Sequence, residues 1–332
     1  MNPVRTLLAF CATLVPATVI VVGHGLGRAE KRTLALTVVF ACTAIFLFGA
    51  IQLSTSNSLG VLYEHVTLRP SILYGTLANR NSTAVLFVIA LCLVAGFPWP
   101  NITVTRIALG AAALLLVLGT VLTQSRSGIA LLALPLVLAI FRLAWTLRSG
   151  RNKGAPSMAR EVWIGIAAIG VLAAAVAVSA TQNGRAADSL ARFETIADSD
   201  RPEMWEDATY TAGQYWPAGA GVGTFDDVFQ LHESLEYVGP LRAGRAHSDL
   251  IELVIEGGIL AIVLTAAWLA WCAYASLRPG SVENWWVRLG AGAGIAALFL
   301  QSALDYPLRN LSVLAVAAVL VVLLIPSKER RS

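Results

Sequence analysis

The chain has 332 residues, of which 57% are hydrophobic and 13% are charged, and its mean hydropathy is +0.70. Because soluble domains carry roughly 25% charged residues, this composition excludes an ordinary soluble fold and indicates that lipid is the solvent. The net charge of +4 is spread over many short segments, which argues against nucleic acid as a partner.

Apolar runs long enough to cross a bilayer follow one another along the chain. A membrane-spanning helix needs about 20 mostly apolar residues, and about nine segments come close to that length. They are residues 6–23, 33–53, 80–97, 104–122, 127–147, 161–181, 249–274, 287–304 and 311–325. The sequence therefore predicts an all-α fold, a polytopic membrane helical bundle in which residues 1–332 form a single integral membrane domain.

The cysteines fall inside these predicted spans, where they behave as small apolar side chains rather than as disulfide partners. No Cys-x-x-Cys or His-x-x-x-His spacing occurs in the sequence, so we expect no metal site and no bound cofactor. The four cysteines are Cys11, Cys42, Cys92 and Cys272.

The orientation of the bundle follows from its basic residues, because cytoplasmic loops hold an excess of lysine and arginine. All three lysines, Lys31, Lys153 and Lys328, lie in segments that fall on the same side of such a bundle. That side is predicted to be cytoplasmic, which leaves the N-terminus outside. The segments expected on the outer side are residues 54–79, 123–126, 182–248 and 305–310.

Polar turns lie at several of the predicted outer helix ends. The turn at residues 123–128 has no room for a separate loop, so Arg126 is expected at the membrane boundary. Its guanidinium group would either reach lipid phosphates or form paired hydrogen bonds to a diphosphate. Two further polar turns, at residues 75–83 and 305–310, could also contact a ligand. Their candidate residues are Asn79, Arg80, Asn81 and Asp305.

The long outer loop at residues 182–248, between the sixth and seventh predicted spans, is expected to contain short helices. A helix is predicted to begin near Arg201, because Asp200 and Glu203 have the spacing of a capping box. This helix either presents Arg201 to a ligand or lies on the membrane surface without a chemical role. The glycines of residues 217–225 favour a tightly packed turn over direct contact with a substrate.

The loop ends at the entrance to the seventh span, which either Ser248 or Asp249 can cap. His247 stands there, and histidine titrates near neutrality and can accept a proton from a hydroxyl group. The alternative is a surface histidine without a role. Asp249, Glu252 and Glu256 follow at spacings of three and four, so they share one helix face. Carboxylates in a membrane helix normally face a cavity or a charged partner.

These stretches, in this order, resemble the O-antigen ligase and polymerase superfamily of membrane glycosyltransferases. The resemblance covers roughly residues 70 to 325, and its most specific part is the entry to the seventh span at residues 246–249 together with residues 256–258. The other matching pieces are residues 75–81, 125–128, 217–225 and 305–307, with Arg201 and Trp205.

The resemblance implies a reaction and a set of site residues. A glycan carried on undecaprenyl diphosphate would pass to an acceptor hydroxyl with inversion, without metal, at the periplasmic face of the inner membrane. Arg126 and Arg201 would hold the diphosphate, and His247 would activate the acceptor. Further candidates for substrate binding are Arg245, Asn79, Arg80, Asn81, Asp249 and Asp305.

Two alternatives to an O-antigen ligase remain at this point. A repeat-unit polymerase of the same superfamily would use the same chemistry on a different acceptor glycan. A transporter or flippase would place its polar groups near the bilayer midplane and often shows two related halves. The polar turns of this chain lie at predicted helix ends instead, which favours transfer over transport. The partners expected are therefore the lipid-linked glycan, an acceptor glycolipid or glycan, and membrane lipids.

Overall fold

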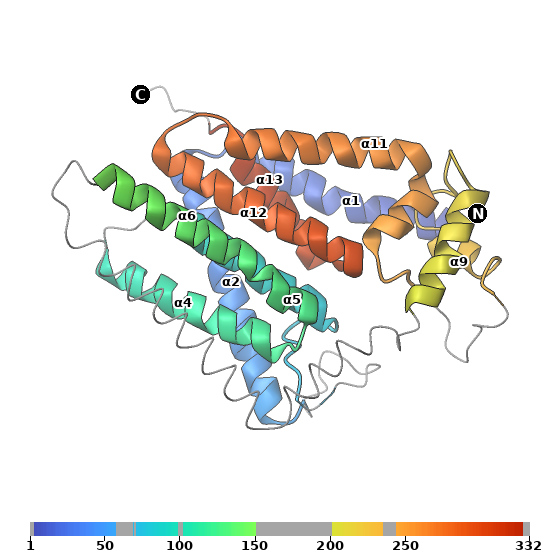
Figure 1. Ribbon diagram of the computed structural model, residues 1–332, viewed down its shortest axis with the longest axis horizontal. Helices are drawn as coiled ribbons and strands as arrows, with labels where there is room; N and C mark the ends of the chain where they lie inside the picture. The colour runs from blue at the N-terminus through green and yellow to red at the C-terminus, as the bar shows by residue number, and fades with distance from the viewer. Residues whose placement is uncertain are drawn as a thin grey trace. The chain divides into compact units, whose positions relative to one another are not determined.

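The computed structural model describes residues 3–57, 69, 71–98, 102–150, 201–234 and 244–327 (Figure 1). Within these residues the regular structure is entirely helical, with no strand. The helices are α1 (Pro3–Gly23), α2 (Arg28–Ser54), α3 (Arg80–Gly96), α4 (Thr103–Leu122), α5 (Arg126–Leu131), α6 (Ala133–Gly150), α9 (Arg201–Gln214), α10 (Phe225–Phe229), α11 (Asp249–Leu277), α12 (Val282–Leu304), the 3-10 helix η3 (Pro307–Arg309) and α13 (Leu311–Leu324).

The predicted polytopic all-α membrane bundle is confirmed. Among the described residues, 6 helices are long and apolar enough to cross a membrane, and α3 and α13 are shorter apolar helices. Every predicted span but one coincides with a helix or with the consecutive helices α5 and α6. The exception, residues 161–181, lies outside the described residues, as does the first part of the 182–248 loop. That residues 1–332 form a single membrane domain stays a prediction.

The chain divides into two compact units. One, called here the terminal unit, comprises Met1–Arg28, Thr195–Arg278 and Leu298–Ser332. The other, the central unit, comprises Ala29–Glu194 and Pro279–Ala297. Helix α12 therefore begins in the central unit and ends in the terminal unit.

The central unit is built around α3. Residues 82–93 of this helix are all buried, and α4, α5 and α6 pack against it. Glycines let α12 approach α3 closely, because a Cβ atom on Gly96 would lie 2.5 Å from the carbonyl oxygen of Trp286 and 2.8 Å from Cα of Gly290. Small residues at helix crossings are a common way for membrane helices to pack, since the lipid provides no hydrophobic driving force.

In the terminal unit, α11 is broken at Gly258, where the backbone has φ 54 and ψ −145. The break frees backbone groups, and the glycine-rich turn at residues 217–223 binds them. Ala220 N donates to Ile255 O at 2.8 Å, and Gly221 N donates to Glu256 O at 2.9 Å. In return, Ile259 N donates to Pro217 O at 3.0 Å. The turn thus satisfies the groups that a kinked helix leaves unpaired.

Helix α11 is long and apolar enough to cross a membrane, as predicted for residues 249–274, and the break at Gly258 divides it into two helical parts. At 1.5 Å per residue, the part from 259 to 277 extends about 28 Å, which by itself matches a hydrocarbon core of about 30 Å. Its apolar side chains are largely exposed, as Leu260, Val263 and Leu264 are, which suits contact with lipid. The first two turns of α11, which carry the carboxylates, form a separate short helix.

Replacing Gly258 by Ala should destabilise this arrangement. A Cβ atom there would overlap the carbonyl oxygen of Pro217, and the positive φ already disfavours any other residue. We expect the free energy of unfolding to fall by about 2 kcal/mol, measured by denaturation in detergent. Gly213 is the matched control, because a Cβ atom on it would meet nothing within 4 Å. An unchanged stability of Gly258→Ala would contradict the role given to the break.

Candidate active site

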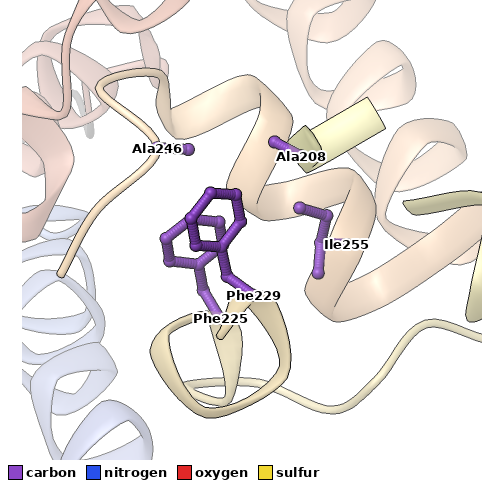
Figure 2. Packing of buried hydrophobic residues seen from close by; sticks show 5 residues of the cluster. All are labelled: Ala208, Phe225, Phe229, Ala246 and Ile255. Atoms are coloured by element: carbon purple, nitrogen blue, oxygen red, sulfur yellow. The ribbon is translucent and has the colours of Figure 1, made fainter. Parts of the chain in front are cut away.

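A small apolar core holds the residue that precedes His247. Ala246 is fully buried among Ala208 of α9, Phe225 and Phe229 of α10, and Ile255 of α11, as Figure 2 shows. The two phenylalanine rings stack with their centroids 5.2 Å apart. This core ties three helices together and fixes the end of the 182–248 loop where it enters α11.

The backbone of His247 adopts an uncommon conformation and is held on both sides. Its φ is 49, in the left-handed region that non-glycine residues rarely occupy. On one side, Trp205 Nε1 donates to Ala246 O at 2.8 Å. On the other, Ser248 caps α11 by accepting from Ile251 N at 3.3 Å, and Asp249 N donates to Asp305 O at 3.0 Å. One of the two predicted caps, Ser248, is therefore the observed cap.

The imidazole ring lies between solvent and a buried carboxylate. The side chain of His247 is 41% exposed, and its Nδ1 lies 3.8 Å from Oδ1 of Asp305, which is 1% exposed. The ring of Tyr306 packs beside it, with centroids 5.2 Å apart. At 3.8 Å the two atoms form an ion-pair contact and not a hydrogen bond, and the negative charge on this side favours the tautomer with its proton on Nδ1, in which Nε2 is the proton acceptor. The geometry thus suits a general base.

The three carboxylates of α11 share one face, as their spacing predicts, and they converge on Arg309. Its Nη2 lies 2.7 Å from Glu252 Oε2 and 3.2 Å from Glu256 Oε2. Its Nε lies 3.8 Å from Asp249 Oδ1. Burial lowers the pKa of the Arg309 guanidinium, but the carboxylates outweigh that effect and raise the pKa above its ordinary value. Arg309 is therefore a charged partner for all three.

Each carboxylate also fastens a different backbone segment to α11. Asp249 Oδ2 accepts from Leu308 N at 3.0 Å and from Ser302 Oγ at 3.1 Å. Glu252 Oε1 accepts from Ala246 N at 3.0 Å, and Glu256 Oε1 accepts from Phe225 N at 3.3 Å. The cluster therefore joins the 302–309 segment, the residue before His247 and the start of α10.

Two polar turns lie at one end of the central unit. Asn79 caps α3, and its side chain accepts from Asn81 N at 2.8 Å and from Ser82 N at 3.3 Å. Ser125 caps α5 by accepting from Gly128 N at 3.1 Å. Gly128 lies against Ala84, about one turn inside each helix, so the two helices begin side by side. Half-buried Arg126 is thereby brought to the same end as Asn79, Arg80 and Asn81.

Comparison with known families finds a similarity over part of the chain. Residues 111–266 match the family model described as O-antigen ligase. Over this segment, called here the O-antigen ligase segment, the chain is similar to that family. No curated protein matches the chain.

The O-antigen ligase segment contains part of the predicted site. Arg126, Arg201, Arg245, His247 and Asp249 fall inside residues 111–266, whereas Asp305 and the turn at Asn79, Arg80 and Asn81 fall outside. Arg201 begins α9, as predicted, and its side chain lies outside the described residues. Arg245 is exposed and pairs with Glu252 at 3.3 Å.

The O-antigen ligase segment and the residues after it also hold three charged residues that sequence reasoning did not assign to the site, Glu252, Glu256 and Arg309. Glu252 and Glu256 were expected to face a partner, but the partner, Arg309, lies about 50 residues further along. The signal in the sequence that could have predicted this partner was the group of unbalanced carboxylates at the start of an apolar helix. The turn at 305–310 contains an arginine whose charge could balance them.

Proposed function

We propose that this protein is a membrane glycosyltransferase of the O-antigen ligase type. It would move a glycan from undecaprenyl diphosphate to an acceptor hydroxyl at the periplasmic face of the inner membrane, in the assembly of lipopolysaccharide or another surface polysaccharide. The observation that carries this proposal is the setting of His247, which lies within the O-antigen ligase segment, half exposed, with Nδ1 facing a buried carboxylate.

The chemistry follows from general acid–base catalysis. Nε2 of His247 takes the proton of the acceptor hydroxyl as the oxygen attacks the anomeric carbon. The bond from that carbon to the diphosphate oxygen breaks, its electron pair leaves with the diphosphate, and the configuration inverts. Arg126 and Arg201 hold the diphosphate, because fixed guanidinium groups stabilise the developing negative charge without a metal ion.

The charges around His247 support this division of roles. Arg309 lies against three carboxylates, so its charge is already balanced. We assign the countercharge for a diphosphate to Arg126 and Arg201 and not to Arg309, with Arg245, which is exposed although it pairs with Glu252, as a third candidate. Asp305 is buried beside the imidazole, and we assign it to orienting His247 rather than to contacting a substrate.

Reconstitution tests the proposal directly. Purified protein in detergent, given an undecaprenyl-diphosphate-linked glycan and candidate acceptors, should form a glycosidic product in the presence of EDTA and without any ion gradient. Replacing Arg126 by Ala should lower kcat/KM by about 10²–10³-fold, which is typical for loss of a group that stabilises the charge developing in the transition state.

Arg106 is the matched control for Arg126. It lies near the start of α4, whereas Arg126 follows the end of that helix. Arg106→Ala should leave transfer unchanged. A folded wild-type protein that forms no product with any acceptor, or an Arg126→Ala variant with full activity, would refute the assignment. In a deletion strain, accumulation of lipid-linked polymer indicates a ligase, whereas short unpolymerised units would indicate a polymerase instead.

A further inference from the structure

The ion-pair cluster of Asp249, Glu252, Glu256 and Arg309 plays no part in the proposed transfer. Glu252 is 0% exposed, and the side chain of Arg309 is 25% exposed. Compared with apolar side chains of the same size, buried ion pairs add little net stability, because desolvating the charges offsets their attraction, although removing one partner alone is costly. A cluster of four such groups beside the candidate base therefore points to a role other than stability.

Glu252 connects the two sides of the His247 site through its two oxygens. Oε1 accepts from the backbone N–H of Ala246, the residue before His247, at 3.0 Å. Oε2 binds Arg309 Nη2 at 2.7 Å and Arg245 Nη1 at 3.3 Å. A single carboxylate thus links the chain before His247 to the turn that follows Asp305.

Asp249 makes a second connection between the same two segments. Its backbone N–H donates to Asp305 O at 3.0 Å, while its side chain accepts from Leu308 N at 3.0 Å and pairs with Arg309 at 3.8 Å. The segment that carries Asp305 is therefore fastened to the first turn of α11, immediately after His247.

These connections act on a residue whose conformation needs support. A non-glycine residue at φ 49 is in a sparsely populated region, and it persists there only when its surroundings fix it. If the peptide before His247 or the Asp305 segment moved, the ring would turn away from the carboxylate that faces Nδ1. A misplacement of about 1 Å at a reacting group can cost roughly 100-fold in rate.

We infer that Glu252 and Arg309 are positioning residues that hold the His247 imidazole against Asp305 and so fix its tautomer, an inference that rests on the proposed function. The same geometry argues against Arg309 as a ligand for the diphosphate. Its Nη2 already contacts two carboxylates, and a phosphate would have to approach through their negative charge.

The test reads the tautomer of His247 without any substrate. In full-length protein with His24, His65 and His232 replaced by Gln, His247 is the only histidine, and ¹⁵N NMR of labelled imidazole reports which nitrogen carries the proton. Two mild variants are compared with this parent. Glu252→Gln keeps the shape and removes the charge, whereas Arg309→Lys keeps the charge and removes the guanidinium fork.

We expect the population of the Nδ1–H tautomer to fall at least about twofold in both variants, with kcat for transfer down about 10–100-fold and KM for the donor unchanged. Arg278→Gln is the control, because Arg278 binds Leu324 O in the same unit but at the far end of α11. Size-exclusion chromatography and thermal unfolding verify that each variant is folded. If Glu252→Gln does not fold, Arg309→Lys still tests the inference.

An unchanged tautomer population in a folded variant overturns the inference, whatever happens to activity, because the cluster would then be structural only. The proposed function fails separately, if folded wild-type protein transfers no glycan to any acceptor. The two results are distinguishable because the NMR measurement needs neither donor nor acceptor.

Discussion

Replacing His247 by Asn is expected to lower the rate of glycan transfer by about 10²–10⁴-fold while the protein still folds and inserts. Asn is a better choice than Ala, because it tolerates the left-handed conformation that φ 49 requires. The substitution therefore removes the proton acceptor with little strain on the backbone. The measurement is single-turnover transfer from a lipid-linked glycan donor in detergent.

His232 provides the control for this experiment. It lies in the same unit, and its ring packs against Tyr210 and Tyr215, with centroids 5.9 and 5.8 Å away. His232→Asn should transfer glycan at the wild-type rate. If His247→Asn were equally active, proton abstraction by this residue would have to be abandoned.

Replacing Arg309 by Leu is expected to lower the free energy of unfolding by about 3 kcal/mol, because it leaves Glu256 without this charged partner and Glu252 with the exposed Arg245 alone. Glu252 would lose its contact at 2.7 Å and Glu256 its contact at 3.2 Å. Denaturation in detergent, followed by tryptophan fluorescence, measures the change.

A compensating variant separates charge from packing in this second experiment. When Arg309→Leu is combined with Glu252→Gln and Glu256→Gln, the unpaired charges disappear while the amide oxygens can still accept from Ala246 N and Phe225 N, and much of the lost stability should return. An Arg309→Leu protein as stable as the wild type would show that the carboxylates are not held by this arginine.

Local patterns predicted a large part of the fold and some of the site. The membrane spans follow from runs of apolar residues, because each helix must hide its backbone from lipid by itself. Ser248 as a cap, and the shared face of Asp249, Glu252 and Glu256, follow from helix geometry within one segment. The spans, the cap and the shared helix face depend only on residues close together in the sequence, so the sequence can predict them.

Features that join distant segments were not readable in the same way. The periodicity of α11 does not predict that Arg309 is the partner of its carboxylates. That contact depends on how α12 and η3 return the chain to the start of α11. The break at Gly258 depends on the turn at 217–223, which supplies the hydrogen bonds that the bent helix lacks. Joint action of Arg126 and His247 on one diphosphate-linked donor stays a prediction, which the activity of their variants tests.

The break in α11 also sets how this helix meets bilayers of different thickness. An unbroken helix of 29 residues would extend about 43 Å and would have to lean by about 45° to fit a hydrocarbon layer of about 30 Å, beyond the tilt usual for membrane helices. Because of the bend at Gly258, the apolar part from 259 to 277 alone matches the hydrocarbon layer in length, so crossing the layer requires no large tilt. The first two turns of α11, which carry Asp249, Glu252 and Glu256, then need not enter the acyl-chain region.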